Sequence, residues 1–438
     1  MAISLGKRIH AAKAKATESP DVTIAGWVKS VRLVGKLAFV ILRDRSGTIQ
    51  LTFKTETPNF EALKTLQAES VIAAAGDVVK GKVKSGENEL LVKEWTMLSP
   101  AETPLPIDVW GNTPTALDKR LDWRSVDLRE PKNQTVFKIQ STLVYSAIDY
   151  LTKEGFTIVF TPSLMGVPSE SGSEMFEVPY FKKKAFLRQD PQLHRQLTII
   201  GGVEKLVDVG PSWRAELSHT HHHLCEHRTI AVEQAFVGDE QDVMRLEENL
   251  IVEMLKSVKK NCNEELKILG KEIIVPETPF PELRYPEIYD ILAKLWKKIT
   301  YGKEHDRESE GLLGQYVQKK YGHQFYWINR FPFAVKPFYV MRVDETPEWA
   351  RSVDLMFKGI ELSSGGQREH RYEKLMEQVR EKGISPSSVE WFTKFFRYGA
   401  PPHGGFAIGV ERITAQLLDL EDIREAVLFT RDPERLVP

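Results

Sequence analysis

Cysteine is scarce in this sequence: among 438 residues there are two, Cys225 and Cys262. Two cysteines cannot build a disulfide framework or a CxxC zinc site, and such usage is typical of a reducing cytosol. Apolar runs are far shorter than the roughly 20 residues that a membrane-spanning helix needs. The sequence also lacks a GxxxxGK[ST] phosphate loop and a GxGxxG fingerprint, so a nucleotide would have to be held in another way. We therefore expect a cytoplasmic protein with no transmembrane helix.

Neither charge is in excess over the whole chain, where 60 Lys and Arg face 61 Asp and Glu. The balance is uneven, however, because residues 1–100 hold 15 Lys and Arg against 10 Asp and Glu. A basic small domain on a near-neutral body fits contact with a phosphate backbone at one end of the chain. A lysine-rich solvated surface explains the same numbers, so charge alone does not decide.

The first hundred residues contain short β-rich segments separated by turn residues. These segments are Val22–Val28, Ala38–Arg43, Thr48–Phe53, Val78–Val83 and Glu89–Trp95. Together with one helical stretch, Phe60–Leu66, they predict a small Greek-key barrel of the OB type. The prolines that follow between residues 100 and 114 indicate a stiff linker.

From about residue 135 the pattern changes to long helices and to strands without regular βαβ alternation. Helical periodicity is present in Val136–Glu154, Gln241–Val258, Tyr372–Glu381, Ser388–Phe396 and Val410–Leu418. Strands are expected at Leu206–Arg214, Thr229–Phe236, Phe325–Ile328, Phe338–Arg342, Val353–Phe357 and Gly405–Gly409. This order predicts an α+β fold in which a mostly antiparallel sheet is flanked by helices.

Two arginines each follow a predicted strand. Arg214, with Glu216 two residues later, ends one strand, and Arg412 lies in the first turn of a helix. An arginine can bind a phosphate or a carboxylate through two parallel hydrogen bonds. The helix dipole opposes a cation in the first turn unless an anion lies there too. A surface ion pair explains either arginine alone, but together they predict an anion site.

Hard oxygen ligands stand in a third segment. Asp354, Glu361 and Ser364 precede Gly365-Gly366-Gln367-Arg368, and two carboxylates with a hydroxyl suit a Mg²⁺ ion that bridges phosphates. With the two arginines, these residues describe an ATP site that has a magnesium ion and a sheet as its floor.

These motifs resemble the class II aminoacyl-tRNA synthetases of the aspartyl, asparaginyl and lysyl subgroup. Over essentially the whole chain the resemblance is to archaeal-type aspartyl-tRNA synthetases. Motif 1 of that family is similar to Gly155–Leu164, motif 2 to Trp213–Glu216 and motif 3 to Gly409–Arg412, while Arg120–Arg129 resembles the hinge signature. The resemblance implies an OB-fold anticodon-binding domain over residues 1–101, a hinge over 102–134 and a class II catalytic domain over 135–438.

The resemblance also implies an activity and its partners. It implies activation of L-aspartate with ATP and Mg²⁺, transfer to tRNA(Asp), and a homodimer formed through motif 1. Whether tRNA(Asn) is charged as well stays open.

The implied catalytic residues are Arg214, Glu216 and Arg412. The implied amino-acid site consists of Glu170, Gln192, Leu193, His194, Arg195, Arg214, Ser364 and Arg368. The implied ATP site consists of Arg214, Ala215, Glu216, His222, His223, Leu224, Glu361, Gly409, Val410, Glu411 and Arg412. Glu361, Ser364 and Asp354 are implied for Mg²⁺, and Arg32, Phe39 and Gln50 for the anticodon.

Several positions depart from the family pattern. Aspartyl enzymes usually have serine, tyrosine and lysine where Asp190, His194 and Arg195 stand, and arginine where His222 stands. Two cations facing one carboxylate favour aspartate over asparagine by charge pairing. The departures leave two alternatives open: a paralogue that activates another amino acid such as asparagine, and a catalytically impaired tRNA-binding protein.

A histidine-rich segment lies after motif 2. Its members are His219, His221, His222, His223 and His227. Imidazoles at this density are compatible with a zinc site, but carboxylates or thiolates at ordered spacing do not accompany them. A loop that folds over ATP and the tRNA acceptor end is the interpretation that we favour.

Overall fold

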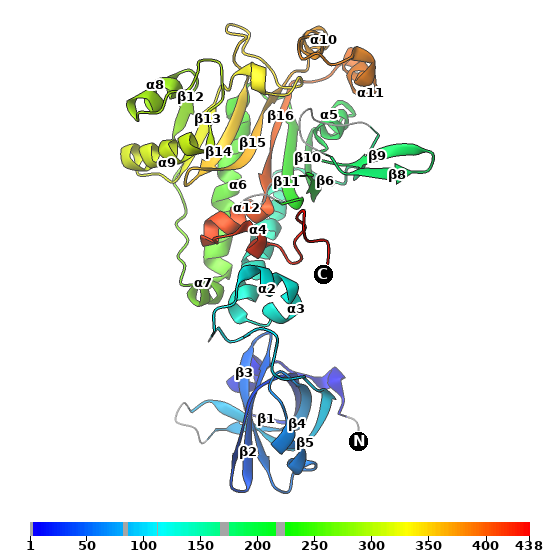
Figure 1. Ribbon diagram of the computed structural model, residues 1–438, viewed down its shortest axis with the longest axis vertical. Helices are drawn as coiled ribbons and strands as arrows, with labels where there is room; N and C mark the ends of the chain where they lie inside the picture. The colour runs from blue at the N-terminus through cyan, green and yellow to red at the C-terminus, as the bar shows by residue number, and fades with distance from the viewer. Residues whose placement is uncertain (1–2, 82–85, 112, 167–174, 216–223) are drawn as a thin grey trace. The chain divides into compact units, whose positions relative to one another are not determined.

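The computed structural model describes residues 3–81, 86–111, 113–166, 175–215 and 224–438. The chain divides into two compact units, Met1–Pro106 and Ile107–Pro438, coloured from blue to red along the chain in Figure 1. Each unit has its own hydrophobic core. No helix in the described ranges combines the length and the apolar character that crossing a membrane requires.

The first unit is a closed barrel. Its strands are β1 (Ser19–Val34), β2 (Leu37–Asp44), β3 (Gly47–Lys54), β4 (Val71–Lys80) and β5 (Asn88–Ser99), in the order β1-β2-β3-β5-β4. β3 and β5 pair in parallel and the other neighbours pair antiparallel. Alternate residues such as Ile24, Val40 and Leu51 point inward and are fully buried. Helix α1 (Ala11–Ala16) and the 3₁₀ turn η2 (Phe60–Thr65) add further residues to this core.

The fourth barrel strand begins seven residues before the predicted segment that starts at Val78. The missed part, Val71–Asp77, is rich in alanine and glycine, which have low strand propensity. Close strand packing favours these small residues here, because a Cβ on Gly76 would lie 2.0 Å from the carbonyl oxygen of Leu91. Tertiary contact therefore overrides local preference in β4.

The second unit is built on an eight-stranded sheet. Its strands follow the order β12 (Glu282–Arg284), β13 (Phe325–Asn329), β14 (Ser352–Phe357), β15 (Ile360–Arg368), β16 (His403–Gly409), β11 (Glu226–Ala235), β10 (Lys205–Trp213) and β6 (Thr157–Val159). The six inner strands pair antiparallel, and each edge strand pairs in parallel with its neighbour. The predicted α+β class and mostly antiparallel sheet are confirmed.

Long helices cover one face of this sheet. Helices α4 (Pro131–Lys153) and α6 (Glu240–Asn261) pack on it together with α12 (Val410–Leu418). The core between helices and sheet includes Ile230 of β11, Leu355 of β14 and Ile408 of β16. Because strand residues alternate between faces, Thr229 and Ala407, which precede Ile230 and Ile408, face the other side. We call the helix-covered side the closed face and the other side the open face.

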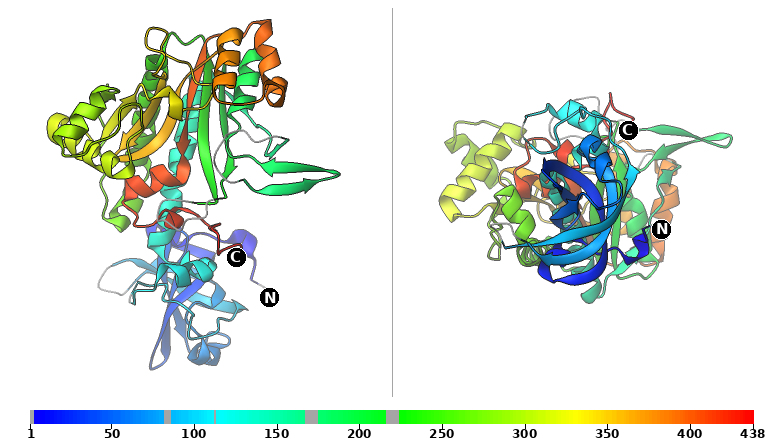
Figure 2. Two further views of the ribbon diagram at one scale, coloured as in Figure 1. Left: turned by 45° about the horizontal axis from the view of Figure 1, so that its top comes forward. Right: turned by 90° about the horizontal axis from the view of Figure 1, so that it is seen from below.

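Shorter helices complete the second unit. They are α2 (Leu117–Asp122), α3 (Arg124–Asp127), α5 (Gln192–Ile200), α7 (Asn263–Leu269), α8 (Glu287–Lys294), α9 (Arg307–Tyr321), α10 (Tyr372–Glu381) and α11 (Glu390–Thr393). A small second sheet has the order β7 (Leu164–Met165), β9 (Lys183–Leu187), β8 (Glu177–Tyr180). Its β8–β9 hairpin projects from the rest of this unit in Figure 1 and in the left view of Figure 2.

The segment predicted as a hinge, residues 102–134, holds α2, α3 and the start of α4. Arg124 of this segment is only 1% exposed. Its guanidinium donates to the Asp127 carboxylate at 2.6 Å and to the carbonyl oxygen of Val427 at 2.8 Å. These contacts join the segment to the C-terminal part of the second unit.

Two predicted elements differ from the structure, and one central strand was not predicted. Phe338–Arg342 is no strand and makes only isolated bridges, such as Val340 with Arg368. Ser388–Phe396 contains the short helix α11 between 3₁₀ turns, not one continuous helix. The central strand β15 had no predicted counterpart, because its glycines and serines have weak strand propensity and its order comes from two neighbouring strands.

Candidate active site

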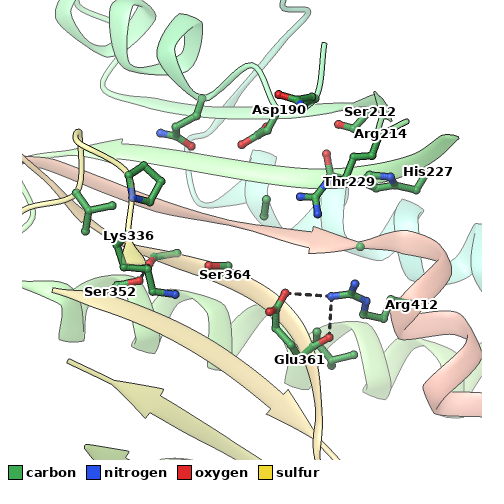
Figure 3. Close-up of a pocket in the computed structure, with 18 of the residues that line it drawn as sticks. Asp190, Ser212, Arg214, His227, Thr229, Lys336, Ser352, Glu361, Ser364 and Arg412 are labelled. Carbon is green, nitrogen blue, oxygen red and sulfur yellow. Dashed lines mark hydrogen bonds and ion pairs between the residues drawn. The ribbon is translucent and has the colours of Figure 1, made fainter. Parts of the chain in front are cut away.

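A cavity of about 500 Å³ opens on the open face of the eight-stranded sheet. Figure 3 shows side chains from β10, β11, β15 and the start of α12 pointing toward it. The lining residues that the sequence had predicted for a site are Gln192, Arg214, Leu224, Glu361, Ser364, Arg368, Gly409, Glu411 and Arg412. Residues from strands that are far apart in sequence therefore share one cavity.

The two predicted arginines lie on the same side of this cavity. Arg214 follows the last residue of β10, and its backbone N–H donates to the carbonyl oxygen of Cys225 at 3.0 Å. Arg412 donates from Nη1 to Oε1 of Glu361 at 3.0 Å and to the backbone oxygen of Glu361 at 3.1 Å (Figure 3). The anion that the dipole argument requires beside Arg412 is therefore a carboxylate of the protein itself.

A β-bulge in β15 decides which of its side chains reach the cavity. Leu355 of β14 pairs with Ser363, but the next residue, Met356, pairs with Glu361, so Leu362 is an extra residue on β15. In a regular strand, residues three apart point to opposite faces. The extra residue reverses the alternation between Glu361 and Ser364, so the two side chains point to the same face. Both therefore line the cavity.

The third predicted magnesium ligand lies next to Ser364 in the sheet. Asp354 pairs with Ser364 across the β14–β15 ladder and is 5% exposed. Burial raises the pKa of Asp354 to about 7; the Lys336 ammonium, 3.5 Å from its Oδ2, opposes this effect and the Glu361 charge adds to it. Its Oδ1 has no hydrogen-bond partner among the described residues. A buried carboxylate oxygen without a donor, near a hydroxyl and a second carboxylate, fits a hard divalent cation.

The other end of the cavity holds a buried polar network. Arg368 donates from Nε to Oε1 of Glu233 at 3.0 Å and from Nη2 to the carbonyl oxygen of Gly405 at 3.0 Å. Gln192 donates to Oε2 of Glu233 at 2.9 Å. Glu233 is fully buried and Arg368 is 6% exposed. The predicted reader of the substrate side chain is therefore held in a fixed orientation by a carboxylate partner.

Asp190 and Arg195 form an ion pair beside this network. Nη2 of Arg195 lies 2.7 Å from Oδ2 of Asp190 and donates to Gln192 at 2.9 Å. Arg195 is 1% exposed, and Asp190, rather than Arg195, is among the lining residues. The acidic residue at position 190 thus compensates the cation at position 195 inside the protein.

The remaining predicted site residues lie in different surroundings. Leu193 belongs to the core between α5, α10 and α11, and the His194 ring contacts that of Trp391 at a centroid distance of 5.2 Å. Ala215 and Val410 adjoin lining residues in sequence without lining the cavity in the described part of the chain. Glu170, Glu216, His222 and His223, together with His219 and His221, lie outside the described residues.

His227 is the histidine of the predicted cluster that the structure describes. It lines the cavity, and burial lowers its pKa to about 4, with the positive charges of Arg214 and Arg412 adding to the effect. The imidazole is therefore neutral at pH 7 and can accept a hydrogen bond from a ligand. Among the described residues, no group of three or more His, Cys, Asp or Glu side chains is arranged to hold a metal ion.

Gly405, which precedes motif 3, is required by the packing of the sheet and not by contact with a ligand. From the sequence alone, glycines at such a place are interpreted as letting a ligand approach the backbone. A Cβ on Gly405, however, would lie 1.9 Å from the carbonyl oxygen of Val232 on the neighbouring strand. At Gly405 the structure therefore shows that the backbone of β11 approaches too closely for any side chain.

In the first unit, the predicted anticodon residues share one face of the barrel. Arg32 of β1 pairs directly with Phe39 of β2, and Phe39 pairs with Thr52 of β3. Gln50 is two residues from Thr52 along β3, so it lies on the same face, diagonal to Phe39. Its amide donates to Glu89 at 2.5 Å. A cation, an aromatic ring and an amide are therefore adjacent on the outside of the barrel.

Comparison with known sequence families agrees with both units. The family described as tRNA synthetases class II (D, K and N) matches residues 116–433, and the OB-fold nucleic acid binding domain matches residues 22–98. The chain belongs to the class II aminoacyl-tRNA synthetases. The predicted family and the predicted combination of an OB-fold with a class II catalytic fold are confirmed.

Within that class, the similar proteins include aspartate–tRNA ligases and an asparaginyl-tRNA synthetase. The chain is 42% identical to the aspartate–tRNA(Asp) ligase of Pyrococcus abyssi, over 95% of this chain and 96% of that protein. It is 38% identical to the aspartate–tRNA(Asp/Asn) ligase of Archaeoglobus fulgidus, over 98% of this chain and all of that protein. The asparaginyl-tRNA synthetase of Pyrococcus horikoshii, solved with asparaginyl-adenylate, superposes with a TM-score of 0.91 at 30% identity, covering 98% of this chain and 99% of that one.

Sequence reasoning did not assign a role to several lining residues. Lys336, Ser212 and Thr229 line the cavity, as do Asp190 and His227. Ser212 and Thr229 lie on the cavity side of predicted strands, so their alternation with buried residues was a usable signal. Lys336 stands in a proline-flanked loop after η3 (Phe333–Val335), and nothing in its local sequence indicates that it approaches Asp354.

Proposed function

We propose that this chain is an aspartate–tRNA ligase that activates L-aspartate with ATP and transfers it to tRNA(Asp). The observation that supports this proposal most is the convergence of Arg214, Arg412 and Glu361 on one cavity in the open face of a class II sheet. Relatives at 42% identity over almost the whole chain, themselves aspartate–tRNA(Asp) ligases, support the choice of amino acid.

In the proposed reaction the substrate carboxylate attacks the α-phosphate of ATP. An aspartyl-adenylate forms as the bond between the α- and β-phosphates breaks, and pyrophosphate leaves. Arg214 stabilises the negative charge that gathers on the α-phosphate, because its guanidinium lies among the residues that line the cavity. Arg412 binds the terminal phosphate, which takes the place of the Glu361 carboxylate as the partner of its guanidinium. The terminal hydroxyl of the tRNA then attacks the adenylate, and AMP leaves.

The residues that would hold Mg²⁺ are Glu361, Ser364 and Asp354. When bound, the ion neutralises charge on the triphosphate. Lys336 contributes a second positive charge at the same place, because its Nζ lies 3.5 Å from Asp354 and 3.7 Å from Glu304. The protein therefore meets the phosphates with cations on both sides of the cavity.

Selection of aspartate is proposed to depend on Arg368. The side-chain carboxylate of the substrate pairs with this guanidinium at the end of the cavity, while Glu170 receives the substrate ammonium. Asparagine is the competing substrate, and one observation favours it: both cations at this end already have carboxylate partners, Arg195 with Asp190 and Arg368 with Glu233. A locally neutral pocket discriminates less strongly between a carboxylate and an amide.

Pyrophosphate exchange measured with each amino acid tests this proposal. We expect exchange with aspartate, and we expect Arg368→Ala to abolish it while ATP binding is retained. Activation of asparagine instead of aspartate would identify a paralogue, and ATP binding without exchange would identify an impaired tRNA-binding protein. Unchanged aspartate kinetics in the Arg368 variant would contradict the assignment of specificity to that residue.

The barrel is proposed to bind the anticodon. The face formed by Arg32, Phe39 and Gln50 offers a ring for base stacking, with a cation for the phosphate and an amide for a base edge. The relatives include aspartate–tRNA(Asp/Asn) ligases as well as aspartate–tRNA(Asp) ligases. Charging assays with both purified tRNAs decide between the two modes, because a discriminating enzyme charges tRNA(Asp) alone.

A homodimer through motif 1 completes the proposal. β6 is an edge strand of the large sheet, and exposed apolar side chains stand nearby in sequence: Ile158, Phe160 and Leu164 are 41%, 86% and 46% exposed. An exposed apolar group on a sheet edge is typical of an interface. Light scattering should give twice the chain mass, and a mass of one chain at micromolar concentration would exclude a stable dimer.

A further inference from the structure

Helix α6 carries three buried carboxylates under the closed face of the sheet. Glu240 and Glu247 are fully buried and Glu248 is 5% exposed. Their spacing of seven and eight residues places them on one side of the helix, among the apolar residues that form the core. Glu248 accepts hydrogen bonds from the indole N–H of Trp327 at 2.7 Å, and Glu240 from Asn329 at 3.4 Å, so both are bonded to β13.

Glu247 makes its contact with a different strand. The hydroxyl of Ser363 on β15 donates to Oε1 of Glu247, and Ser363 is itself 2% exposed. Ser363 directly follows the extra residue Leu362 and directly precedes Ser364. The carboxyl group under the sheet is thus bonded to the back of the bulge that shapes the cavity.

The two faces of β15 are linked through this bulge. Ser363 pairs with Leu355 and Ile408, whose side chains belong to the closed-face core, so its hydroxyl needs a partner on that side. A shift by one residue would bring Ser363 to the cavity and turn its neighbours to the core. The bond to Glu247 therefore favours the one register in which Glu361 and Ser364 both face the cavity.

We propose that Glu247 is a positioning residue for the triphosphate end of the site, which it controls through Ser363 and the bulge at Leu362. This inference rests on the proposed function, since it takes the ligand of Glu361 and Ser364 to be a nucleotide-bound divalent cation. Groups that orient metal ligands without touching the metal typically affect its affinity by about 10- to 100-fold.

The state of the Glu247 carboxyl is consistent with this role. Burial raises its pKa to about 8, the bond from Ser363 opposes this, and the charge of Asp354 adds to it. Its Oε2 has no hydrogen-bond partner among the described residues. A neutral carboxyl holds Ser363 without adding a negative charge beneath the residues that would bind the cation. Glutamine has the same shape and also offers an acceptor oxygen, so it should replace glutamate in this role.

Four variants of the full-length protein test the inference. Glu247→Leu and Ser363→Ala each remove the bond, and Glu247→Gln keeps it. Glu248→Leu is the matched control, since it removes a buried carboxylate on the same helix that is bonded to β13. The readout is the dissociation constant of Mn²⁺, measured by electron paramagnetic resonance with a non-hydrolysable ATP analogue.

We expect Mn²⁺ binding to weaken about 10-fold or more in Glu247→Leu and Ser363→Ala and to change by less than about twofold in Glu247→Gln and Glu248→Leu. The Glu247→Leu, Ser363→Ala double variant should lose no more than the worse single variant, because both remove one bond. If Glu247→Leu does not fold, Ser363→Ala decides, since it deletes a single oxygen.

Wild-type affinity for Mn²⁺ in Ser363→Ala would overturn the inference, and so would an equal loss in Glu248→Leu. A wild-type protein that binds Mn²⁺ with the analogue but exchanges pyrophosphate with no amino acid overturns the proposed function alone. In that case the variants still test the positioning role. A wild-type protein that binds no Mn²⁺ with the analogue overturns both.

Discussion

At the scale of single residues, the arginine in the first turn of α12 is the clearest conflict between local and tertiary preference. The N-terminal end of a helix favours anions, yet Arg412 lies there and is paired with Glu361 at 3.0 Å. The side chain of Glu361 is 40% exposed and that of Arg412 33% exposed, so the pair can be separated by a ligand. The structure therefore shows that a carboxylate accompanies the cation in the first turn of α12, as the dipole argument requires.

Replacing Arg412 by alanine tests its role. We expect kcat/KM for pyrophosphate exchange to fall by about 10²- to 10³-fold, because a preorganised charge opposite the phosphates is lost. Arg245→Ala is a suitable control, since that arginine is exposed on α6 and paired with Asp242 of the same helix. A loss of less than about threefold in the Arg412 variant would contradict the role.

The buried carboxyl of Glu247 predicts a pH dependence of stability. In the unfolded chain it loses its proton near pH 4.5, whereas in the folded protein its pKa is about 8. Between these values the folded state binds one proton more, so the free energy of unfolding falls as pH rises from 4.5 to 8. Glu247→Gln has no titratable group at this position, so this contribution to the pH dependence of stability is absent.

We therefore expect Glu247→Gln to gain stability relative to wild type between pH 5 and pH 8.5. The difference in the free energy of unfolding should be on the order of a few kcal/mol, and the thermal midpoint of the variant should rise relative to that of wild type. Differential scanning fluorimetry across this range measures the effect. Glu253→Gln, at a half-exposed position on the same helix, should follow wild type at every pH. Parallel pH profiles for Glu247→Gln and wild type would show that the carboxyl is ionised in the folded protein.

At the scale of elements, α6 and β15 illustrate how the closed face supports the open one. α6 begins at Glu240 with Asp239 as its N-cap, whose side chain accepts from the backbone N–H of Gln241 at 2.9 Å. β15 contains no long apolar run, and its geometry comes from β14, β16 and the helix beneath it. An irregular, polar strand can therefore occupy the centre of a sheet because its neighbours determine its register.

The N-cap of α6 provides a test at this scale. Asp239→Ala should lower the stability of the second unit by about 1 kcal/mol, since a backbone donor in the first helical turn loses its partner. Asp239→Ser keeps a capping oxygen and should recover most of the loss. Thermal unfolding followed by circular dichroism makes the comparison. Equal midpoints for Asp239→Ala and wild type would show that the cap does not contribute to the stability of the protein.

At the scale of the whole molecule, the two proposed activities, anticodon binding and amino-acid activation, belong to two units with separate cores. The barrel core is formed within residues 11–95, and the core beneath the active site within residues 136–418. Each of the proposed binding surfaces is built from residues of one unit only. Loss of a side chain on the barrel face should therefore leave amino-acid activation unchanged.

Phe39→Ala tests this separation. We expect pyrophosphate exchange with aspartate to stay at the wild-type level, and tRNA charging to need about 5- to 100-fold more tRNA, since one stacked base is worth about 1–3 kcal/mol. Met97→Ala removes another exposed apolar side chain of the barrel, from β5, and serves as control. A fall in exchange caused by Phe39→Ala would show that the two units are coupled.

Residue types and their spacing were sufficient to predict the phosphate-binding groups of the candidate site and their order along the chain. Arg214, Arg412 and the acidic segment at Glu361 could be identified because few residue types bind phosphates, and the positions of most strands and helices followed from periodicity. The OB-type barrel and the mostly antiparallel sheet could be predicted for the same reason, whereas the class II fold was implied by the resemblance of three motifs to that family. Helix α12 spans Val410–Leu418, as the periodicity of the sequence predicts.

How these residues meet in space depends on the folded chain. The bulge at Leu362, the pairs Asp190 with Arg195 and Glu233 with Arg368, and the approach of Lys336 to Asp354 are not readable from local sequence. Strand register and burial determine them, and both depend on contacts between residues that are far apart in the chain. A side chain that binds a ligand and one that binds its own protein look the same in sequence, because the difference lies in the partner.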